Sequence, residues 1–351
     1  AYPAGSTGSG ALYEIVGHKW FLSAPMSDAF LVLAYADDGL SCFLLPRFMP
    51  DGERNALRIT RLKDKLGDWS NASSEAEVEG ALAWRVGEEG RGVATILEMV
   101  ALTRQDCMIG STSIMRHALV QAIHHARHRR AFGRALIDQP LMRNVLADLA
   151  LECEAHVALT ARVARAGEGA GTRPTEGALF RIATAIGKYW VCKRAPSFVN
   201  EAQECLGGAG YVEESILPRL YRQAPLNSIW EGSGNVQCLD VLRALARQPQ
   251  TRDAFFAELA DARGENPALD ALAERLRGDL ARPDVPEGLS RVLVERMAVA
   301  MQAALLIRAA AGPVADAFCA SRLGGAHGTT FGTLEAAAPV GELIERAFPE
   351  V

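Results

Sequence analysis

The sequence predicts an α+β protein: an antiparallel β-domain followed by a four-helix bundle and an extra carboxyl-terminal helical region. Three observations support this class. Short strand-like runs fill residues 1–85, and long stripes of apolar residues with helical spacing begin after residue 90. The segment after residue 249 is again helical in pattern but rich in alanine and interrupted by prolines. The expected domains are therefore residues 1–85, 86–248 and 249–351.

The β-domain is expected from short runs of apolar and β-branched residues. Such runs occupy residues 12–16, 30–34, 42–45 and 76–79. Turn-forming residues at 37–39 (Asp-Asp-Gly) and 50–52 (Pro-Asp-Gly) separate them.

Four helices are expected after residue 90. The first covers about 92–130, and Pro140 suits the first turn of the second. A glycine-rich linker at 167–177 leads to a third helix at about 178–206, and a fourth is expected from 235 to about 247. Long amphipathic helices with short connections predict an antiparallel bundle.

Composition narrows the possible classes of protein. The 351 residues carry a net charge of −5 and are 49% hydrophobic, which excludes a disordered chain and a globally basic, nucleic-acid-coating surface. No apolar run is long enough to cross a bilayer, so no membrane association is expected. The seven cysteines are scattered and never form a CxxC pair, which indicates free thiols in a reducing cytoplasm and no metal site.

Two charged features are candidates for a functional site, and each has more than one possible role. Arg104 falls on the apolar stripe of the first helix, where it needs an anion or several acceptors. It could form an ion pair between helices or serve a functional site. The basic segment 124–134 could bind metal, nucleic-acid phosphates or a cofactor pyrophosphate, with metal the weakest, or it could be a solvated helix end.

Two glycine-containing segments are also candidates. Three glycines in four positions at 207–210 suggest that the backbone approaches a ligand or another chain. At 227–235, Trp230 and Glu231 sit on a turn before a helix amino terminus, a place that favours anions. The alternative for this second segment is a helix cap with an exposed glutamate.

The order of these motifs resembles the carboxyl-terminal two-thirds of an acyl-CoA dehydrogenase. The motifs are Arg-x-x-Phe-Gly (129–133), Gln-Pro (139–140), Leu-Gly-Gly-x-Gly-Tyr (206–211) and Trp-Glu-Gly-Ser-Gly-Asn (230–235). Segments 61–67, 70–73, 213–215 and 227–235 resemble the AidB, or alkylation-response, branch of that family. The resemblance implies an acyl-CoA dehydrogenase-like fold, and the family's amino-terminal domain is expected to be missing from this sequence.

The resemblance also implies an FAD cofactor and the residues that would hold it. Phe21 and Ser23 would face the isoalloxazine, and Arg129, Phe132 and Gln139 would hold the diphosphate and adenosine. Gly207 and Gly208 would lie beside a neighbouring subunit's FAD. Ser233 and Asn235 would flank the diphosphate and adenine. An FAD shared in this way implies a homodimer or homotetramer.

Catalysis is expected at Glu231, which matches the family's usual base. Branched-chain members place the base where this sequence has Thr103, which cannot serve. Glu231 would remove the α-proton of an acyl-CoA thioester while the β-hydride passes to flavin N5, and Arg104 would orient the site. The bulky Trp230 could narrow the acyl pocket.

Two other hypotheses remain. The AidB branch is associated with double-stranded DNA, which suggests a flavoprotein that binds duplex DNA with little turnover. Residues 250–351, however, contain ten arginines, no lysine and fifteen acidic residues, so their net charge has the wrong sign for phosphate binding. The last hypothesis is a truncated homologue with only a structural or interaction role.

Overall fold

The computed structural model describes residues 1–282, 285–309 and 312–348. Contacts divide the chain into two compact units, Ala1–Leu102 and Thr103–Val351, each with its own hydrophobic core. The segment expected to form a third domain therefore shares one unit with the helical bundle. The three-domain division itself stays a prediction.

The first unit is built on an antiparallel sheet. Its strands are β1 (Tyr2–Pro3), β2 (Leu12–Ser23), β3 (Ala29–Ala36), β4 (Gly39–Pro46), β5 (Leu57–Leu62) and β6 (Ser73–Val86). The order is β1-β2-β6-β4-β3, and β5 also pairs with β6. Strand β6 is therefore central: β2 pairs along most of its length, while β5 and β4 pair with its first and last parts.

Each expected strand run lies inside an observed strand, and both expected turns are present. The alternation in β6 buries Ala76 and Val78 against the core of this unit. Strand β5 was not anticipated. Its sequence includes Arg58 and Arg61, whose side chains pair with glutamates on the neighbouring strand β6 rather than entering the core. The run therefore lacks the apolar signal of the other strands.

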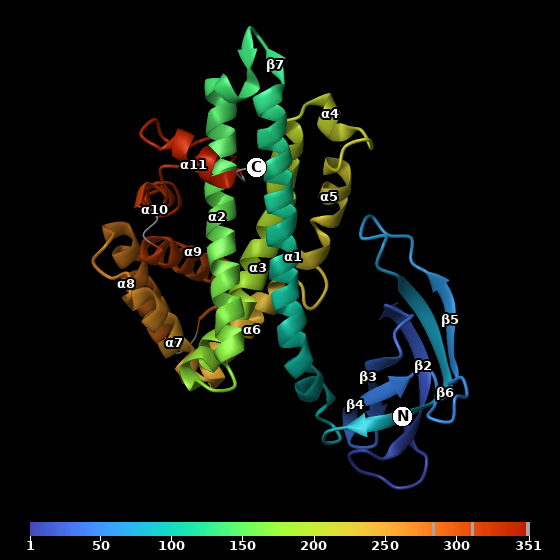
Figure 1. Ribbon diagram of the computed structural model, residues 1–351. Helices are drawn as coiled ribbons and strands as arrows, with labels where there is room; N and C mark the ends of the chain where they lie inside the picture. Colours follow the sequence, from blue (N-terminus) through green and yellow to red (C-terminus); the bar gives the residue numbers. More distant parts are fainter. Residues whose placement is uncertain (283–284, 310–311, 349–351) are drawn as a thin grey trace. The chain divides into compact units, whose positions relative to one another are not determined.

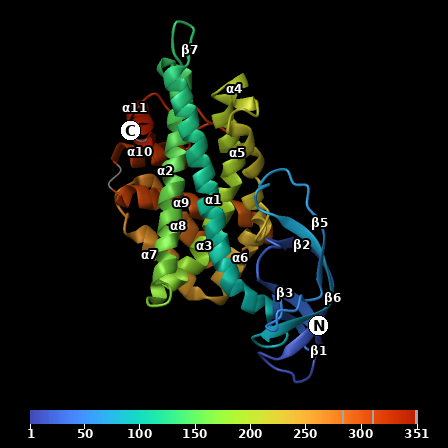
Figure 2. The same cartoon turned by 45° about the vertical axis from the view of Figure 1, so that its right-hand side comes forward.

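The second unit is helical (Figures 1 and 2). The long helices are α1 (Gly92–His128, which begins in the first unit), α2 (Pro140–Gly169), α3 (Pro174–Glu204) and α6 (Gly234–Arg247). Between them lie β7 (Arg130–Ala131), β8 (Arg134–Ala135), η1 (Leu136–Asp138), α4 (Gly208–Tyr211), α5 (Leu217–Gln223) and η2 (Leu226–Ser228). After them come α7 (Pro249–Ala260), α8 (Pro267–Ala281), η3 (Glu287–Leu289), α9 (Ser290–Arg308), α10 (Gly312–Phe318), the π-helix η4 (Cys319–Leu323) and α11 (Val340–Ala347).

The four expected helices are confirmed, with Pro140 in the first turn of α2. The glycine-rich linker is shorter than expected, because α2 continues to Gly169 and α3 begins at Pro174. A Cβ on Gly167 would lie 2.9 Å from the Phe180 ring, so this glycine allows two helices to approach closely. The glycines here serve packing as well as chain reversal.

The helices after α6 pack onto the bundle. Asp148 and Glu152 on α2 are buried and bind Arg322, which lies in η4. On the surface, Arg346 of α11 pairs with Glu154 of α2. The carboxyl-terminal helices are thus attached to α2 by both buried and exposed ion pairs.

The seven cysteines are all free and buried. Burial raises the pKa of the Cys192 thiol to about 12 and that of Cys107 to about 11, so these thiols stay protonated near neutral pH. Within the described ranges, no helix combines the length and apolar character needed to span a bilayer.

Candidate active site

Glu231 lies on a tight turn between η2 and α6 and is half-buried. Its φ of 58° is in the left-handed region, which costs a non-glycine residue about 1–3 kcal/mol. Gly232 follows with a φ of 95°, and a Cβ there would lie 2.7 Å from Nε2 of Gln237. Such strain persists only where surrounding contacts hold it, so the turn is a fixed conformation rather than a loose helix cap.

Side chains from two helices hold the carbonyl oxygen of Glu231. Arg104 on α1 donates from Nε at 3.1 Å, and Gln237 on α6 donates from Nε2 at 3.1 Å. Gln237 also donates to the carbonyl of Gly232 at 3.0 Å. The peptide on the carboxyl side of Glu231 is therefore fixed from two directions.

A third helix holds the neighbouring carbonyl groups. Lys188 on α3 donates from Nζ to the carbonyl oxygen of Trp230 at 2.6 Å and also to that of Gly232. Lys188 is only 1% exposed. Burial lowers the pKa of this ammonium, while the neighbouring Cys192 and Cys107 oppose that shift. Sequence reasoning missed Lys188, because no local motif distinguishes it on its helix.

The carboxylate of Glu231 also has a partner. Thr103 on α1 donates from Oγ1 to Oε2 of Glu231 at 2.8 Å. The preceding Trp230 donates from its indole to Asn227 at 2.9 Å, and Asn227 in turn donates to Ser111 at 3.1 Å. Both the acid and the bulky side chain beside it therefore have defined positions.

Arg104 forms the expected ion pair between helices and also contacts the Glu231 turn, while its role in catalysis stays a prediction. Its Nη1 lies 2.8 Å from the buried carboxylate of Asp240 on α6, and that carboxylate also binds Arg181 of α3 at 2.8 Å. The arginine thus forms an ion pair between helices while its Nε contacts the Glu231 turn. The ion pair fixes the guanidinium that supports the turn.

Another group of predicted residues lies near the β7–β8 hairpin. Phe132 at its tip is 95% exposed with a φ of 51°. Among the described residues, the Arg129 guanidinium has no ion-paired or hydrogen-bonded partner. Gln139 is engaged within the chain: it donates to the Ala131 carbonyl at 3.1 Å and accepts from Arg134 at 3.0 Å.

The glycine segment after α3 divides into two parts. A Cβ on Gly207 or Gly208 would meet no atom within 4 Å, so the space beside them is open. A Cβ on Gly210 would lie 2.2 Å from the carbonyl oxygen of Gln203. The expected close approach to a ligand or another chain therefore does not explain Gly210, which packs against its own chain.

Ser233 and Asn235 flank the amino terminus of α6. The Ser233 hydroxyl makes no capping bond. Asn235 is engaged, because its Oδ1 accepts a hydrogen bond from Arg291 of α9 at 2.8 Å. Arg291 brings a positive charge to this helix terminus, and sequence reasoning missed it because it lies far away in the chain.

A single chain does not bring the two groups of residues together. Twenty-five residues of one helix and its end separate Arg104 from Arg129, about 37 Å at 1.5 Å per residue. In both views the hairpin and α4 lie toward one end of the bundle and α6 toward the other (Figures 1 and 2). The Glu231 turn and the Arg129–Phe132 hairpin are therefore separate sites on one chain.

Phe21 and Ser23 belong to the first unit and are exposed on β2. The ring of Phe21 meets that of Trp20 edge-on, with centroids 4.9 Å apart. Lys63 lies over both rings, 3.8 Å from the Trp20 centroid and 4.7 Å from that of Phe21. The two exposed rings offer an apolar surface, while the Lys63 ammonium is already paired with Glu75.

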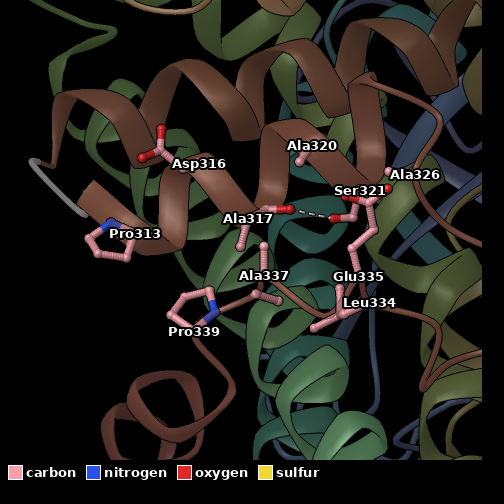
Figure 3. Close-up of a pocket in the computed structure, with 11 residues that line it drawn as sticks. Pro313, Asp316, Ala317, Ala320, Ser321, Ala326, Leu334, Glu335, Ala337 and Pro339 are labelled. Atoms are coloured by element: carbon pink, nitrogen blue, oxygen red, sulfur yellow. Dashed lines mark hydrogen bonds between the residues drawn. The ribbon is translucent and has the colours of Figure 1, made fainter.

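The carboxyl-terminal helices enclose a separate cavity of about 300 Å³, lined by residues of α10, η4 and the segment 326–339 (Figure 3). Ser321 in its wall donates to the Ala317 carbonyl at 2.6 Å. None of the predicted site residues lines it. Across the described part of the chain, no cluster of three His, Cys, Asp or Glu side chains is placed to hold a metal ion.

The sequence is similar to those of known proteins. The family described as acyl-CoA dehydrogenase, C-terminal domain, matches residues 90–246. AidB of Escherichia coli (strain K12) is 48% identical over 307 residues, which cover 88% of this chain and 56% of AidB. Acyl-CoA dehydrogenase family member 11 of Caenorhabditis elegans is 35% identical over 256 residues, which cover 69% of this chain and 42% of that protein. The chain thus spans about half the length of these relatives.

Solved structures share the fold. Caenorhabditis elegans ACDH-11 in complex with C11-CoA superimposes with a TM-score of 0.84 at 29% identity, covering 91% of this chain and 60% of that one. The Bd2924 apo-form gives a TM-score of 0.80 at 31% identity, and the match covers 88% of this chain and 63% of that one. The predicted fold class is therefore confirmed, and this chain belongs to the acyl-CoA dehydrogenase family, in the branch represented by AidB.

Proposed function

We propose that this chain carries the catalytic base of an FAD-dependent, acyl-CoA dehydrogenase-like oxidoreductase. The observation that carries the proposal is the Glu231 turn. A half-buried carboxylate occupies a strained conformation, and side chains from α1, α3 and α6 hold the backbone around it. A group fixed in this way can meet a substrate without first being ordered.

An acyl-CoA thioester is the proposed substrate. The C11-CoA complex of the related ACDH-11 supports this class. Glu231 would accept the α-proton of the acyl chain on its carboxylate. The backbone N–H of Glu231 would donate to the thioester carbonyl oxygen and stabilise the negative charge that develops there as the proton leaves.

Residues on this chain fit an FAD molecule. Open space beside Gly207 and Gly208, an exposed Phe132 and an Arg129 guanidinium with no partner among the described residues suit a diphosphate and an aromatic ring. The exposed Trp20–Phe21 pair suits an isoalloxazine. FAD, when bound, would supply the acceptor for the β-hydride. Asn235 and Gln139 already make hydrogen bonds within the chain, but a side-chain amide has two donors and two acceptor lone pairs, so both could also contact the cofactor.

The test is an anaerobic visible spectrum of the purified protein, titrated with short and branched acyl-CoAs. We expect a flavin spectrum that bleaches on addition of a substrate. Glu231→Gln should retain flavin but bleach at least about a hundredfold more slowly, because the base is lost. The matched control is Glu214→Gln, which removes an exposed carboxylate from the loop between α4 and α5 and should bleach at the wild-type rate.

Any of three results would overturn the proposal. Bleaching at the wild-type rate in Glu231→Gln would remove Glu231 from the chemistry. A flavin that no thioester bleaches would remove the dehydrogenase activity and leave a flavoprotein without turnover. A protein without flavin would favour the structural homologue.

A further inference from the structure

The peptide group between Trp230 and Glu231 has an unusual pair of environments. Its carbonyl oxygen accepts a hydrogen bond from the ammonium of Lys188 at 2.6 Å. Its N–H, on Glu231, has no hydrogen-bond acceptor among the residues that the structure describes. One end of this peptide is therefore bound to a cation, and the other end is available to a ligand.

Lys188 is a costly residue for a merely structural hydrogen bond. It is 1% exposed, and no carboxylate in the described part of the chain lies within ion-pair distance of it. Burying a charge without a counter-ion costs several kcal/mol, whereas a neutral amide could donate to the same two carbonyls. The position of the charge therefore calls for an electrostatic explanation.

The conjugation of the amide group provides an electrostatic explanation for the charge on Lys188. The Trp230 carbonyl and the Glu231 N–H belong to one planar peptide, and no described peptide bond is cis, so the two groups point in opposite directions. A cation at the oxygen draws electron density through the conjugated C–N bond. The N–H then becomes a stronger donor, as in other cooperative hydrogen-bond chains in a medium of low dielectric constant.

We propose that Lys188 is a positioning residue that polarises the Trp230–Glu231 peptide and thereby strengthens the Glu231 N–H as a donor to the carbonyl of an acyl thioester. This inference rests on the proposed function and adds a residue to it. Lys188 acts from behind the peptide and does not touch the substrate. Its contribution grows as negative charge develops on the thioester oxygen, so it favours the transition state over the bound substrate.

The test measures how strongly the site polarises the carbonyl group of a bound thioester. Crotonyl-CoA labelled with ¹³C at the thioester carbonyl is bound to the full chain, and its carbonyl stretch is recorded by isotope-edited infrared difference spectroscopy. In the wild type we expect a stretch below that of the free thioester. In Lys188→Met, which keeps the length but loses the charge, about half or more of this shift should disappear. In the same variant, kcat for acyl-CoA oxidation should fall about tenfold or more, while KM should change less than about twofold.

Two variants complete the comparison. Lys188→Gln keeps an N–H donor without the charge, so its carbonyl shift should lie between those of wild type and Lys188→Met. Lys193→Met removes an exposed lysine from the same helix and should leave the shift unchanged. A Lys188→Met protein that binds the probe with the full wild-type shift would overturn the role of Lys188. A wild type that leaves the stretch unshifted would instead overturn the proposed thioester site.

The wild type offers a test that does not depend on the variants folding. The groups facing Lys188 are Cys107 and Arg104 on α1, Cys192 on its own helix and Glu231. Burial raises the pKa values of both thiols, to about 11 and about 12, while it lowers the pKa of Lys188. The carbonyl shift should therefore weaken as pH rises through the range where Lys188 loses its proton, before either thiol ionises. A shift that is constant up to the pH of unfolding would contradict the proposal.

Discussion

A single hydroxyl group positions the proposed base. Thr103 on α1 donates from Oγ1 to the Glu231 carboxylate at 2.8 Å. The sequence predicts that Thr103 cannot serve as the base, and the structure makes its hydroxyl a hydrogen-bond partner of Glu231. The contact holds one oxygen of the carboxylate and so limits the side-chain rotamers of Glu231.

Thr103→Val tests this contact, because it removes the hydroxyl and keeps the shape. We expect flavin bleaching by an acyl-CoA to slow about tenfold, the value of a hydrogen bond to a charged group. Thr103→Ser should restore the rate, since it restores the donor. Stopped-flow absorbance gives both rates. Equal rates in the valine variant and wild type would show that the hydrogen bond does not contribute to positioning.

Sequence reasoning located the turn but not what holds it. The residues 230–235 form a contiguous motif, so Glu231 could be proposed from the sequence. Lys188, Gln237 and Asp240 contact the same site from α3 and α6, and nothing local distinguishes them from other polar helical residues. Such contacts depend on how helices pack, which a single sequence does not specify.

At the scale of elements, buried ion pairs between α2 and η4 attach the carboxyl-terminal helices to the bundle. Arg322 donates to Asp148 at 2.5 Å and to Glu152 at 3.0 Å, and both carboxylates are buried. Arg194 of α3 binds the other oxygen of Glu152 at 2.6 Å. The sequence predicts the helical region but not this attachment, because the paired residues of η4 and α2 are about 170 residues apart.

Arg322→Met should lower the free energy of unfolding by about 3 kcal/mol, because it removes the guanidinium that two buried carboxylates share. Arg194 still binds one of these carboxylates, and His327 still contacts the other. Urea denaturation followed by circular dichroism measures the change. The control is Arg346→Met, which breaks an exposed pair with Glu154 on the same helix α2 and should cost less than about 1 kcal/mol. Similar losses in the two variants would refute the distinction between buried and exposed pairs here.

The same attachment predicts sensitivity to acid. Burial alone would raise the pKa of Glu152, but Arg194, His156 and Arg322 outweigh it and hold this pKa well below 4.5. A lowered folded-state pKa contributes stability that is complete above the unfolded value and is lost as pH falls through the folded one. We therefore expect the free energy of unfolding to decrease with falling pH below about 4.5, and Glu152→Gln to flatten that dependence. An unchanged slope in Glu152→Gln would assign the acid sensitivity to other groups.

At the scale of the whole molecule, the residues predicted to hold one cofactor lie in places that a single chain keeps apart. Arg104, which contacts the Glu231 turn, and Arg129, at the start of the hairpin, are about 37 Å apart along the chain. A second copy of the chain could supply the missing group at each site. This arrangement supports the expected homodimer or homotetramer, which stays a prediction.

Duplex DNA binding also stays a prediction at this scale. The region after residue 250 has fewer basic than acidic residues, and several of its arginines are already paired. Arg308 binds Glu258, Arg322 binds Asp148 and Arg346 binds Glu154. A guanidinium held by a carboxylate has less capacity for phosphate, so any DNA affinity of this region would have to come from its remaining arginines.

Phe132→Ala tests whether the hairpin holds the cofactor and the partner. The side chain is 95% exposed, so its removal should leave the melting temperature unchanged. Because an exposed aromatic ring at a hairpin tip is useful only to something outside the chain, we expect flavin content per protomer to fall several-fold, with a shift toward the monomer on size exclusion. Tyr35→Ala, which removes another aromatic side chain that is 74% exposed, on β3, should alter neither quantity. Full flavin retention and an unchanged elution volume in Phe132→Ala would place the cofactor elsewhere and leave the hairpin without a role in binding it.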